Sequence, residues 1–472
     1  MTTTVNPATG EVLARYTPMT RTEVDQAVTK AATAAAAWGG SAPAAAGAFA
    51  VGQAGASLAV RLQVLSRLAG QLRADSDRLA SLITAEMGKP IAEAEGEIEK
   101  SALTADYYAA NAEAILGDEQ VEVQGAKAWV SYEPIGLVLA VMPWNFPVWQ
   151  VLRFAIPTLA AGNGVLLKHS PNVTGSALEL ERLFVRAGFP EHLVTTLVID
   201  EPEVPETIER LIEDDRIAAV TLTGSNRAGA AVGAAAGKAS KRSVLELGGS
   251  DAFVVLADAD VEAAAAAAVR ARFTNSGQSC VCAKRFIVEA PIADEFLDHF
   301  ILGVKALAVG DPTDRAVSLG PLARDDLRAA LQKQVDDSVA AGAVLAAGGH
   351  SIDGPGYYFE PTVLTGTGPG MPAFDEETFG PLAAVAVAAD AEEAITLANS
   401  TQYGLGLSVW TSTPDRGVEV ARRITSGAAF INAVVASDPR LPFGGTKRSG
   451  YGRELSAAGI REFTNTRTYW VA

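Results

Sequence analysis

The two cysteines of this 472-residue chain, Cys280 and Cys282, are its first candidates for covalent chemistry. They close the segment Asn-Ser-Gly-Gln-Ser-Cys-Val-Cys, which begins at Asn275. A structural cysteine usually lies among apolar residues, whereas small polar residues and Gly277 precede Cys280. This composition favours an irregular, crowded turn that presents the Cys280 thiol to a ligand as a nucleophile.

Other roles for the two thiols have less support. None of the four histidines forms a recognisable spaced pair with the cysteines, so we predict no metal site. A structural disulfide is not expected in a large chain with so few thiols. A reversible bond between Cys280 and Cys282, with Cys282 as a redox partner, stays open because it depends on local geometry.

Two more polar residues accompany runs typical of buried strands. Glu246 lies in Leu-Glu-Leu-Gly-Gly at 245–249, and a buried carboxylate is either paired or kept for proton transfer. The adjacent glycines favour close approach of the backbone to a ligand, so we predict a general base. Asn145 lies in Pro-Trp-Asn-Phe-Pro at 143–147, where its amide suits an oxyanion stabiliser. The alternative is an asparagine that satisfies its own turn.

Two further segments suit a nucleotide. Thr-Gly-Ser at 223–225 follows an apolar strand and opens a helix, whose N-terminus is suited to a pyrophosphate. The spacing is not Gly-x-Gly-x-x-Gly, so an ordinary strand-to-helix turn is the alternative. Lys168 ends another buried strand, and such ends face the ligand crevice of an open α/β sheet. Its alternative is a solvated strand-end lysine.

Composition restricts the partners and the compartment. The chain is 49% hydrophobic and 20% charged, so it is able to bury large cores, and its length suits two or three domains. A net charge of −17 argues against nucleic acid or an anionic membrane as the main partner. We expect no transmembrane helix and no signal peptide, and the cysteine usage fits a reducing cytoplasm.

Short apolar strands alternate with helices along most of the chain, which predicts an α/β fold with parallel sheets. The first series of strands comprises 135–142, 164–168, 194–199, 218–223 and 243–247. Helices are predicted between them, at 173–187 and 228–239. A second series comprises strands 252–256, 285–288, 383–387, 407–411 and 428–432, with a helix at 261–273. Each series predicts one α/β domain.

The N-terminal part and the tail complete this outline. We expect a short strand after the turn at Asn6 and helices from Thr22, at 62–73, after Asp75 and at 91–112. The Gly/Ala-rich tract 39–60 is expected to form a surface connection, with a poorly packed helix as the alternative. Alternation predicts a strand at 127–132. The tail, 464–471, alternates too, and we expect it to join that strand or another subunit.

Taken together, these motifs resemble the NAD(P)-dependent aldehyde dehydrogenase superfamily. The resemblance covers nearly all of Asn6 to Val471 and includes Glu-Glu-Thr-Phe-Gly-Pro at 376–381 and Pro-Phe-Gly-Gly-Thr-Lys-Arg-Ser-Gly at 442–450. Lys-His-Ser-Pro-Asn at 168–172 and Ser-Asp-Pro-Arg-Leu-Pro-Phe-Gly-Gly at 437–445 are most similar to bacterial succinate-semialdehyde dehydrogenases. The resemblance implies oxidation of an aldehyde acid, through a thiohemiacetal and a thioester on cysteine, with NAD or NADP as cofactor.

The resemblance also assigns roles to residues. Cys280 is the nucleophile, Glu246 the general base, and Asn145 with the Cys280 backbone N–H the oxyanion hole. The implied cofactor-binding residues are Met142, Pro143, Trp144, Lys168, Ser170, Gly224, Ser225, Leu247, Glu377 and Phe379. Position 171 is proline where NAD-preferring members commonly have a glutamate that would repel a 2′-phosphate. We therefore expect NADP to be used at least comparably with NAD.

The substrate side is less well defined by sequence. Arg153 follows Asn145 by about two helical turns and is predicted to bind the distal carboxylate of a four-carbon aldehyde acid. Position 274 is threonine where some members have a second arginine. The complete predicted substrate set is Trp149, Arg153, Ser437, Arg440 and Phe443.

The resemblance implies three parts. These are a Rossmann-type nucleotide-binding domain (1–120 and 133–247), an α/β catalytic domain (248–440) and a small β oligomerisation element (121–132 and 455–472) of a homodimer or homotetramer. Alternative functions are an aldehyde dehydrogenase for another short semialdehyde or aliphatic aldehyde, a cofactor-free Cys/Glu thioesterase, and a silent structural protein.

Overall fold

The computed structural model describes residues 1–40 and 55–472. Of the Gly/Ala-rich tract 39–60, residues 41–54 lie outside the described part of the chain. Helix α2 (Leu58–Ala74) begins within the tract, so the last residues of the tract are helical. Within the described residues, no helix has both the length and the apolar character needed to cross a membrane.

A six-stranded sheet forms the centre of the first domain, in the order β17-β9-β8-β5-β6-β7. The five strands predicted from the sequence are parallel to one another, and β17 pairs with β9 in the antiparallel direction at the edge of the sheet. Their bounds are β5 Leu137–Met142, β6 Gly164–His169, β7 Val194–Thr196, β8 Ile217–Thr223, β9 Arg242–Glu246 and β17 Gly450–Tyr451. The predicted parallel sheet is therefore confirmed, although β7 is shorter than expected.

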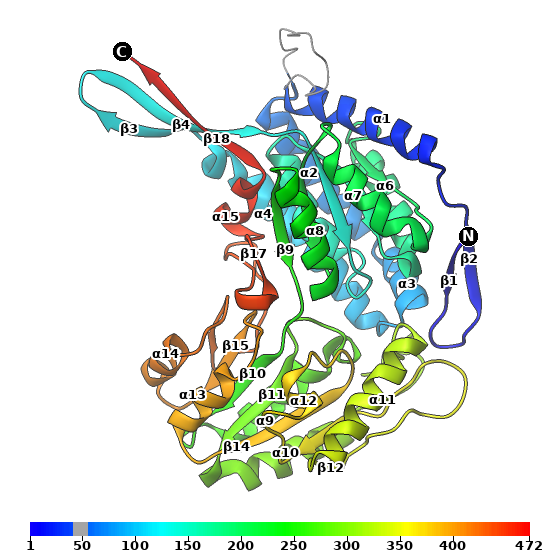
Figure 1. Ribbon diagram of the computed structural model, residues 1–472, viewed down its shortest axis with the longest axis vertical. Coiled ribbons are helices and arrows are strands. Elements are labelled where there is room, and N and C mark those ends of the chain that lie inside the picture. Colours follow the sequence, from blue (N-terminus) through cyan, green and yellow to red (C-terminus); the bar gives the residue numbers. More distant parts are fainter. Residues whose placement is uncertain (41–54) are drawn as a thin grey trace.

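Helices cover this sheet (Figure 1), because parallel strands that are buried on both faces need an apolar layer on each side. In addition to α2, they are α1 Arg21–Gly39, α3 Ser76–Met87, α4 Ile91–Leu116, α5 Trp149–Ala160, α6 Thr174–Ala187, α7 Val204–Glu213 and α8 Asn226–Lys238. A hairpin of β1 (Thr2–Val5) and β2 (Val12–Tyr16) lies along one side. Strand β1 was not predicted.

A seven-stranded sheet, β12-β13-β14-β11-β10-β15-β16, forms the second domain. Every pair is parallel except β12 with β13. The strands are β10 Asp251–Val255, β11 Ala283–Glu289, β12 Val344–Ala347, β13 Thr362–Thr365, β14 Leu382–Ala388, β15 Leu407–Trp410 and β16 Phe430–Ile431. The helices are α9 Val261–Phe273, α10 Ala293–Lys305, α11 Asp325–Ala340, α12 Pro372–Asp375, α13 Ala391–Asn399 and α14 Pro414–Arg422.

The sequence of strand β10 is continuously apolar because both faces of the strand are buried. Phe253 and Val255 face one buried cluster, whereas Ala252 and Val254 face another on the opposite side of the sheet. Successive side chains of a strand point to opposite faces, so a sheet covered twice needs apolar residues at every position. The antiparallel pair β12–β13 was missed, since short edge strands give a weak pattern.

A three-stranded antiparallel sheet, β18-β4-β3, projects from the body of the molecule (Figure 1). It consists of β3 Glu119–Val123, β4 Ala126–Pro134 and β18 Thr464–Val471, which follows α15 (Ser456–Glu462). Trp129 and Tyr469 stack with ring centroids 4.9 Å apart. The predicted pairing of the tail with strand 127–132 is confirmed within one chain.

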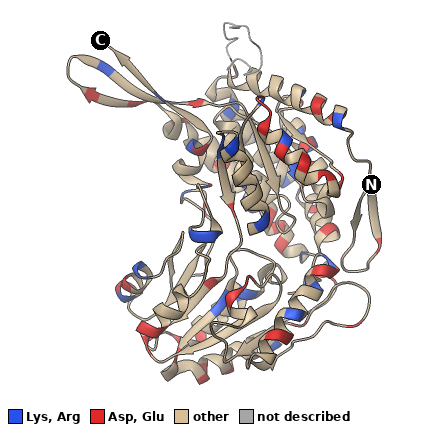
Figure 2. Cartoon of the chain, viewed as in Figure 1, with Lys and Arg blue, Asp and Glu red and all other residues tan. Residues whose placement is uncertain are grey.

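Charged side chains are distributed over both domains. Figure 2 shows basic and acidic residues interspersed on the helices and loops of this view, and neither sign occupies a whole face. The net charge of −17 is therefore spread over many sites. A bound anion must then be held by nearby donors, because no broad basic face in this view attracts it.

Candidate active site

The turn that carries Cys280 is as irregular as its composition predicts. Asn275, Ser276 and Gly277 follow one another with φ of 54°, 53° and 74° in the 3-10 segment after α9. A Cβ atom on Gly277 would lie 2.2 Å from the carbonyl oxygen of Gly380, so only glycine fits there. Left-handed non-glycine residues each cost about 1–3 kcal/mol and persist only where their surroundings hold them.

Hydrogen bonds to the first turn residue hold this conformation. The Asn275 backbone N–H donates to Glu93 Oε2 at 2.6 Å, and burial raises the pKa of Glu93 to about 7. The Asn275 amide donates to the Asn145 carbonyl at 2.8 Å and to the Gln278 carbonyl at 3.1 Å. The turn is thus connected directly to the segment of the predicted oxyanion residue.

A buried lysine holds the other side of the nucleophile. Lys284 Nζ donates to the carbonyl oxygens of Cys280 at 2.9 Å and Ser279 at 3.1 Å, and it lies 3.6 Å from Glu377 Oε1. Lys284 was not among the site residues predicted from the sequence. A charged residue inside the apolar strand β11 was the available signal, because lysine is almost never fully buried without a partner.

The Cys280 thiol lies at the meeting point of two cavities and is partly exposed to them. Burial raises the pKa of Cys280 to about 12, and the positive charges of Arg153 and Lys284 oppose that shift. The thiol is therefore protonated at neutral pH until a nearby base takes its proton.

Asn145 is 4% exposed and directs its amide towards the same turn. Its Nδ2 donates one hydrogen to the Gln278 carbonyl at 3.1 Å, which leaves the second hydrogen for an oxyanion. Glu97 of α4 positions this segment, since its Oε1 accepts the backbone N–H groups of Val148 and Trp149, each at 2.8 Å. Those are donors at the start of α5 that have no partner within the helix.

Glu246 ends β9 with its carboxylate buried, at 2% exposure. Neither carboxylate oxygen has a hydrogen-bond partner in the described part of the chain. Burial raises the pKa of Glu246 well above its usual value, nearby Glu454 adds to the shift, and Arg153 opposes it. Burial therefore favours the protonated form of both Glu246 and Cys280.

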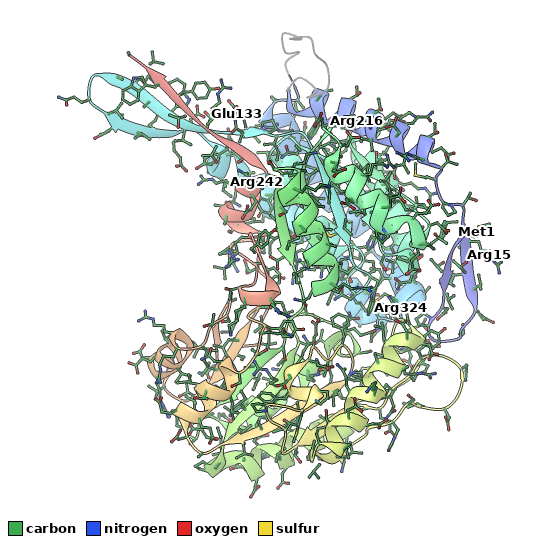
Figure 3. The ribbon with its side chains drawn as sticks, in the orientation of Figure 1. Met1, Arg15, Glu133, Arg216, Arg242 and Arg324 are labelled. Atoms are coloured by element: carbon green, nitrogen blue, oxygen red, sulfur yellow. The ribbon has the colours of Figure 1, made fainter. Side chains whose placement is uncertain are left out.

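The first cavity has features that fit a dinucleotide. The space in it and at its open mouth measures about 700 Å³. It is lined by Pro143, Trp144, Asn145, Gln150, Thr223, Gly224, Ser225, Glu246, Leu247, Gly248, Cys280, Arg324, Leu327, Glu377 and Phe379. The side chain of Ser225 caps α8 by accepting the Ala228 N–H. Because Ser225 also lines the cavity, the N-terminus of this helix lies beside it. Arg324, labelled in Figure 3 at the junction of the domains, lies 5.9 Å from the Trp144 ring.

Glycines and aromatic rings shape this cavity. A Cβ atom on Gly248 would lie 2.3 Å from Glu377 Oε2, so glycine allows the carboxylate to reach the strand end. Glu377 Oε1 accepts the Gly249 N–H at 2.9 Å. Trp144 and Phe379 meet edge to face with centroids 5.6 Å apart. An aromatic pair, a carboxylate and a helix N-terminus suit a nicotinamide, its ribose and a pyrophosphate respectively.

Lys168 lines a shallow, much smaller cavity together with Pro171 and Glu201. Burial lowers the pKa of Lys168, and the nearby Glu201 carboxylate opposes that shift. The sequence analysis missed Glu201. Met142 ends β5, and Ser170 donates to Asn172 Oδ1 at 2.7 Å. Met142 and Ser170 line neither of these two cavities.

The second cavity beside Cys280 is open to solvent, and the space in it and at its mouth measures about 980 Å³. Four predicted substrate residues line it: Trp149, Arg153, Ser437 and Phe443. The structure does not bring Arg440 to this cavity, because its side chain is 74% exposed and paired with Asp438 at 2.6 Å. Sequence reasoning missed Lys100, Gln150 and Arg270, which also line it.

Comparison with known proteins then decides the family. The sequence matches the aldehyde dehydrogenase family over residues 1–469. The chain belongs to the aldehyde dehydrogenase family. This confirms the predicted class, an NAD(P)-dependent aldehyde dehydrogenase, and the predicted α/β architecture.

Two relatives and one solved structure illustrate the similarity. Succinate-semialdehyde dehydrogenase [NADP(+)] of Mycobacterium avium is 46% identical over 471 residues, which are 99% of this chain and 96% of the relative. Succinate-semialdehyde dehydrogenase [NADP(+)] 1 of Mycobacterium tuberculosis is 46% identical over 472 residues, 99% of each chain. The crystal structure of succinic semialdehyde dehydrogenase from Streptococcus pyogenes with NADP+ superposes with a TM-score of 0.94 at 35% identity, covering 100% of both chains.

Reversible oxidation of this aldehyde dehydrogenase is a prediction from the Cys-x-Cys spacing. Both thiols are free, and buried Cys282 donates from Sγ to the Thr274 carbonyl at 3.6 Å. Joining the sulfurs requires this contact to break, so we expect slow loss of activity in mild peroxide and recovery in dithiothreitol. Cys282→Ala is the control: less complete recovery supports the disulfide, and equal recovery in both proteins contradicts it.

Proposed function

We propose that this enzyme oxidises succinic semialdehyde to succinate with NADP+ or NAD+ as the cofactor. The observation that carries the proposal is the position of Cys280, between a cavity suited to a dinucleotide and a cavity lined by basic residues. Two NADP-dependent relatives that share 46% of the sequence support the same substrate. A carboxylate on the substrate explains why basic side chains line the second cavity.

The chain's own groups account for the covalent steps. Glu246 accepts the thiol proton, and the Cys280 sulfur then forms a bond to the aldehyde carbon. The free hydrogen of the Asn145 amide and the Cys280 backbone N–H stabilise the oxyanion that results. Bound NAD(P)+ supplies the acceptor for the hydride that leaves this carbon. Glu246 passes the thiol proton to solvent and is a carboxylate again. It then removes a proton from water, which hydrolyses the thioester and releases the acid.

We also propose the division into nucleotide-binding (1–120, 133–247), catalytic (248–440) and oligomerisation (121–132, 455–472) parts. The projecting sheet supports an interface, since Val121, Trp470 and Val471 on it are exposed apolar residues. A homodimer or homotetramer in the cytoplasm is therefore our proposed state. The free thiols and the net charge of −17 agree with that compartment and with small-molecule rather than nucleic-acid partners.

A substrate panel tests the proposed reaction. Reduced cofactor is followed by its absorbance with succinic semialdehyde, glutaric semialdehyde, butanal and betaine aldehyde, each with NAD+ and with NADP+. We expect the highest kcat/KM with succinic semialdehyde. Equal or higher kcat/KM with butanal or betaine aldehyde would overturn the proposed substrate, and no reduction of either cofactor would overturn the reaction.

Cofactor choice gives a separate prediction. Pro171 and Lys168 line the same cavity, so a glutamate at position 171 would place a negative charge near a 2′-phosphate. We expect Pro171→Glu to lower kcat/KM with NADP+ by about ten- to a hundredfold and to change NAD+ use little. Pro171→Gln is the uncharged control. Strict NAD+ dependence of the parent enzyme, or the same loss in both variants, would contradict this prediction.

A further inference from the structure

Three basic residues line the cavity on the substrate side of Cys280, and they differ in how their charges are matched. Lys100 comes from α4, Arg153 from α5 and Arg270 from α9. An anionic substrate gains most from a cation that is partly desolvated and has no protein counterion, because such a charge is neither screened nor already paired.

Arg153 is not an unpaired cation of this kind. Its side chain is 2% exposed, and its guanidinium forms an ion pair with Glu454, which is 3% exposed. The same guanidinium lies 4.4 Å from the centroid of the Phe443 ring. Its charge is therefore matched within the protein. Arg270 has an exposed side chain at the cavity, so water screens it more strongly.

Lys100 is a partly desolvated cation without a protein counterion among the described residues. The residue is half-buried, and its Nζ donates to Ser437 Oγ at 2.7 Å and lies 4.6 Å from the Trp149 ring centroid. No carboxylate within the described ranges, 1–40 and 55–472, forms an ion pair with it. Lysine nitrogen has three hydrogens, so donors remain after the bond to Ser437. Both residues line the cavity with Cys280.

The carboxylates near Lys100 are engaged elsewhere. Glu97, one turn earlier on α4, pairs with buried Lys89 and accepts two backbone N–H groups of α5. Asp438, next to Ser437 in the chain, accepts the side chain and the backbone N–H of Arg440. The cation of Lys100 is thus left facing the cavity without a counterion.

We propose that Lys100, together with the hydroxyl of Ser437, binds the distal carboxylate of the aldehyde acid and so determines the preference for anionic substrates. The proposal rests on the proposed function and names the residue that carries its specificity. Arg153 is then a positioning residue, which pairs with Glu454 beside the Glu246 carboxylate. Ser437 accepts one hydrogen from Lys100 and keeps its own hydroxyl hydrogen for the substrate.

The charge state of Lys100 supports this role and adds a pH signature. Burial, followed by the positive charge of Arg153 on α5, lowers the pKa of Lys100 to about 8, although Glu97, Asp438 and Cys280 oppose the shift. Lys100 is a cation below that pH and neutral above it. The preference for an anionic over an uncharged aldehyde is therefore present below about pH 8 and declines above it.

The test compares Lys100→Met with the parent enzyme on succinic semialdehyde and on butanal, which has equal length and no charge. Methionine keeps an unbranched side chain of similar length, so the cavity stays filled. We expect kcat/KM to fall about ten- to a hundredfold with succinic semialdehyde and less than about threefold with butanal. Lys305→Met, at an exposed position on α10, changes the net charge equally and is expected to alter neither value.

A pH series and a second variant complete the test. In the parent enzyme the ratio of the two kcat/KM values is expected to decline above about pH 8, and in Lys100→Met it is expected to be low and flat. Titration of Cys280 affects both substrates and cancels in the ratio. Equal losses on both substrates, or selective loss in Arg153→Ala with Lys100→Met unaffected, would overturn the assignment to Lys100. A parent enzyme without preference for the anionic aldehyde would instead overturn the proposed substrate.

Discussion

Replacing Cys280 with alanine is expected to abolish aldehyde oxidation, by at least about 10⁴-fold in kcat, and to leave NADP+ binding unchanged. No other described side chain at the meeting point of the two cavities offers a nucleophilic sulfur, because Cys282 is 2% exposed. Without the sulfur no covalent adduct forms at the aldehyde carbon. Steady-state absorbance measures the loss, and equilibrium titration with NADP+ measures the binding.

Cys282→Ala is the matched control, because it removes the neighbouring thiol from the same turn. We expect it to keep most of the activity, and alkylation by iodoacetamide should still inactivate it. The alkylation rate of the parent protein without cofactor should rise with pH well above neutrality, since burial raises the pKa of Cys280 to about 12. Full activity in Cys280→Ala, with loss in Cys282→Ala, would reverse the assignment.

Replacing Glu246 with glutamine is expected to lower the steady-state rate by about 10²- to 10⁴-fold and to reveal a burst of reduced cofactor. Glutamine preserves the shape of the side chain but accepts no proton. Once Cys280 has been acylated, water then lacks its base and the thioester accumulates. Rapid-mixing absorbance should show a burst close to one equivalent per active site, followed by slow turnover.

The outcome separates two roles of the carboxylate. Because Glu246 also takes the thiol proton in the proposed mechanism, the burst itself should slow, and higher pH should restore it since hydroxide ionises the thiol. Glu454→Gln serves as a comparison, since Glu454 is the nearby buried carboxylate that raises the pKa of Glu246. An unchanged steady-state rate in Glu246→Gln would exclude the base role.

The local sequence was sufficient to predict the strands of the parallel sheets and the residues proposed to carry the covalent steps. Buried parallel strands need apolar residues at successive positions, so β5, β6 and β8 were recognised with small errors at their ends. Glycine beside polar residues predicted the turn at Asn275–Gly277, because few other residues accept a left-handed backbone. Cys280, Glu246 and Asn145 each interrupt a local pattern, and the structure brings all three to one cavity.

The tertiary structure alone decided which charge is free to meet the substrate. Arg153 was selected by its helical spacing from Asn145, and it does line the cavity, but its charge is paired with Glu454, 301 positions later. Lys100 lies on an ordinary charged helix in the sequence, and only folding places it beside Ser437. Whether a charge is available depends on the partners and the water around it, and residues distant in the chain supply both.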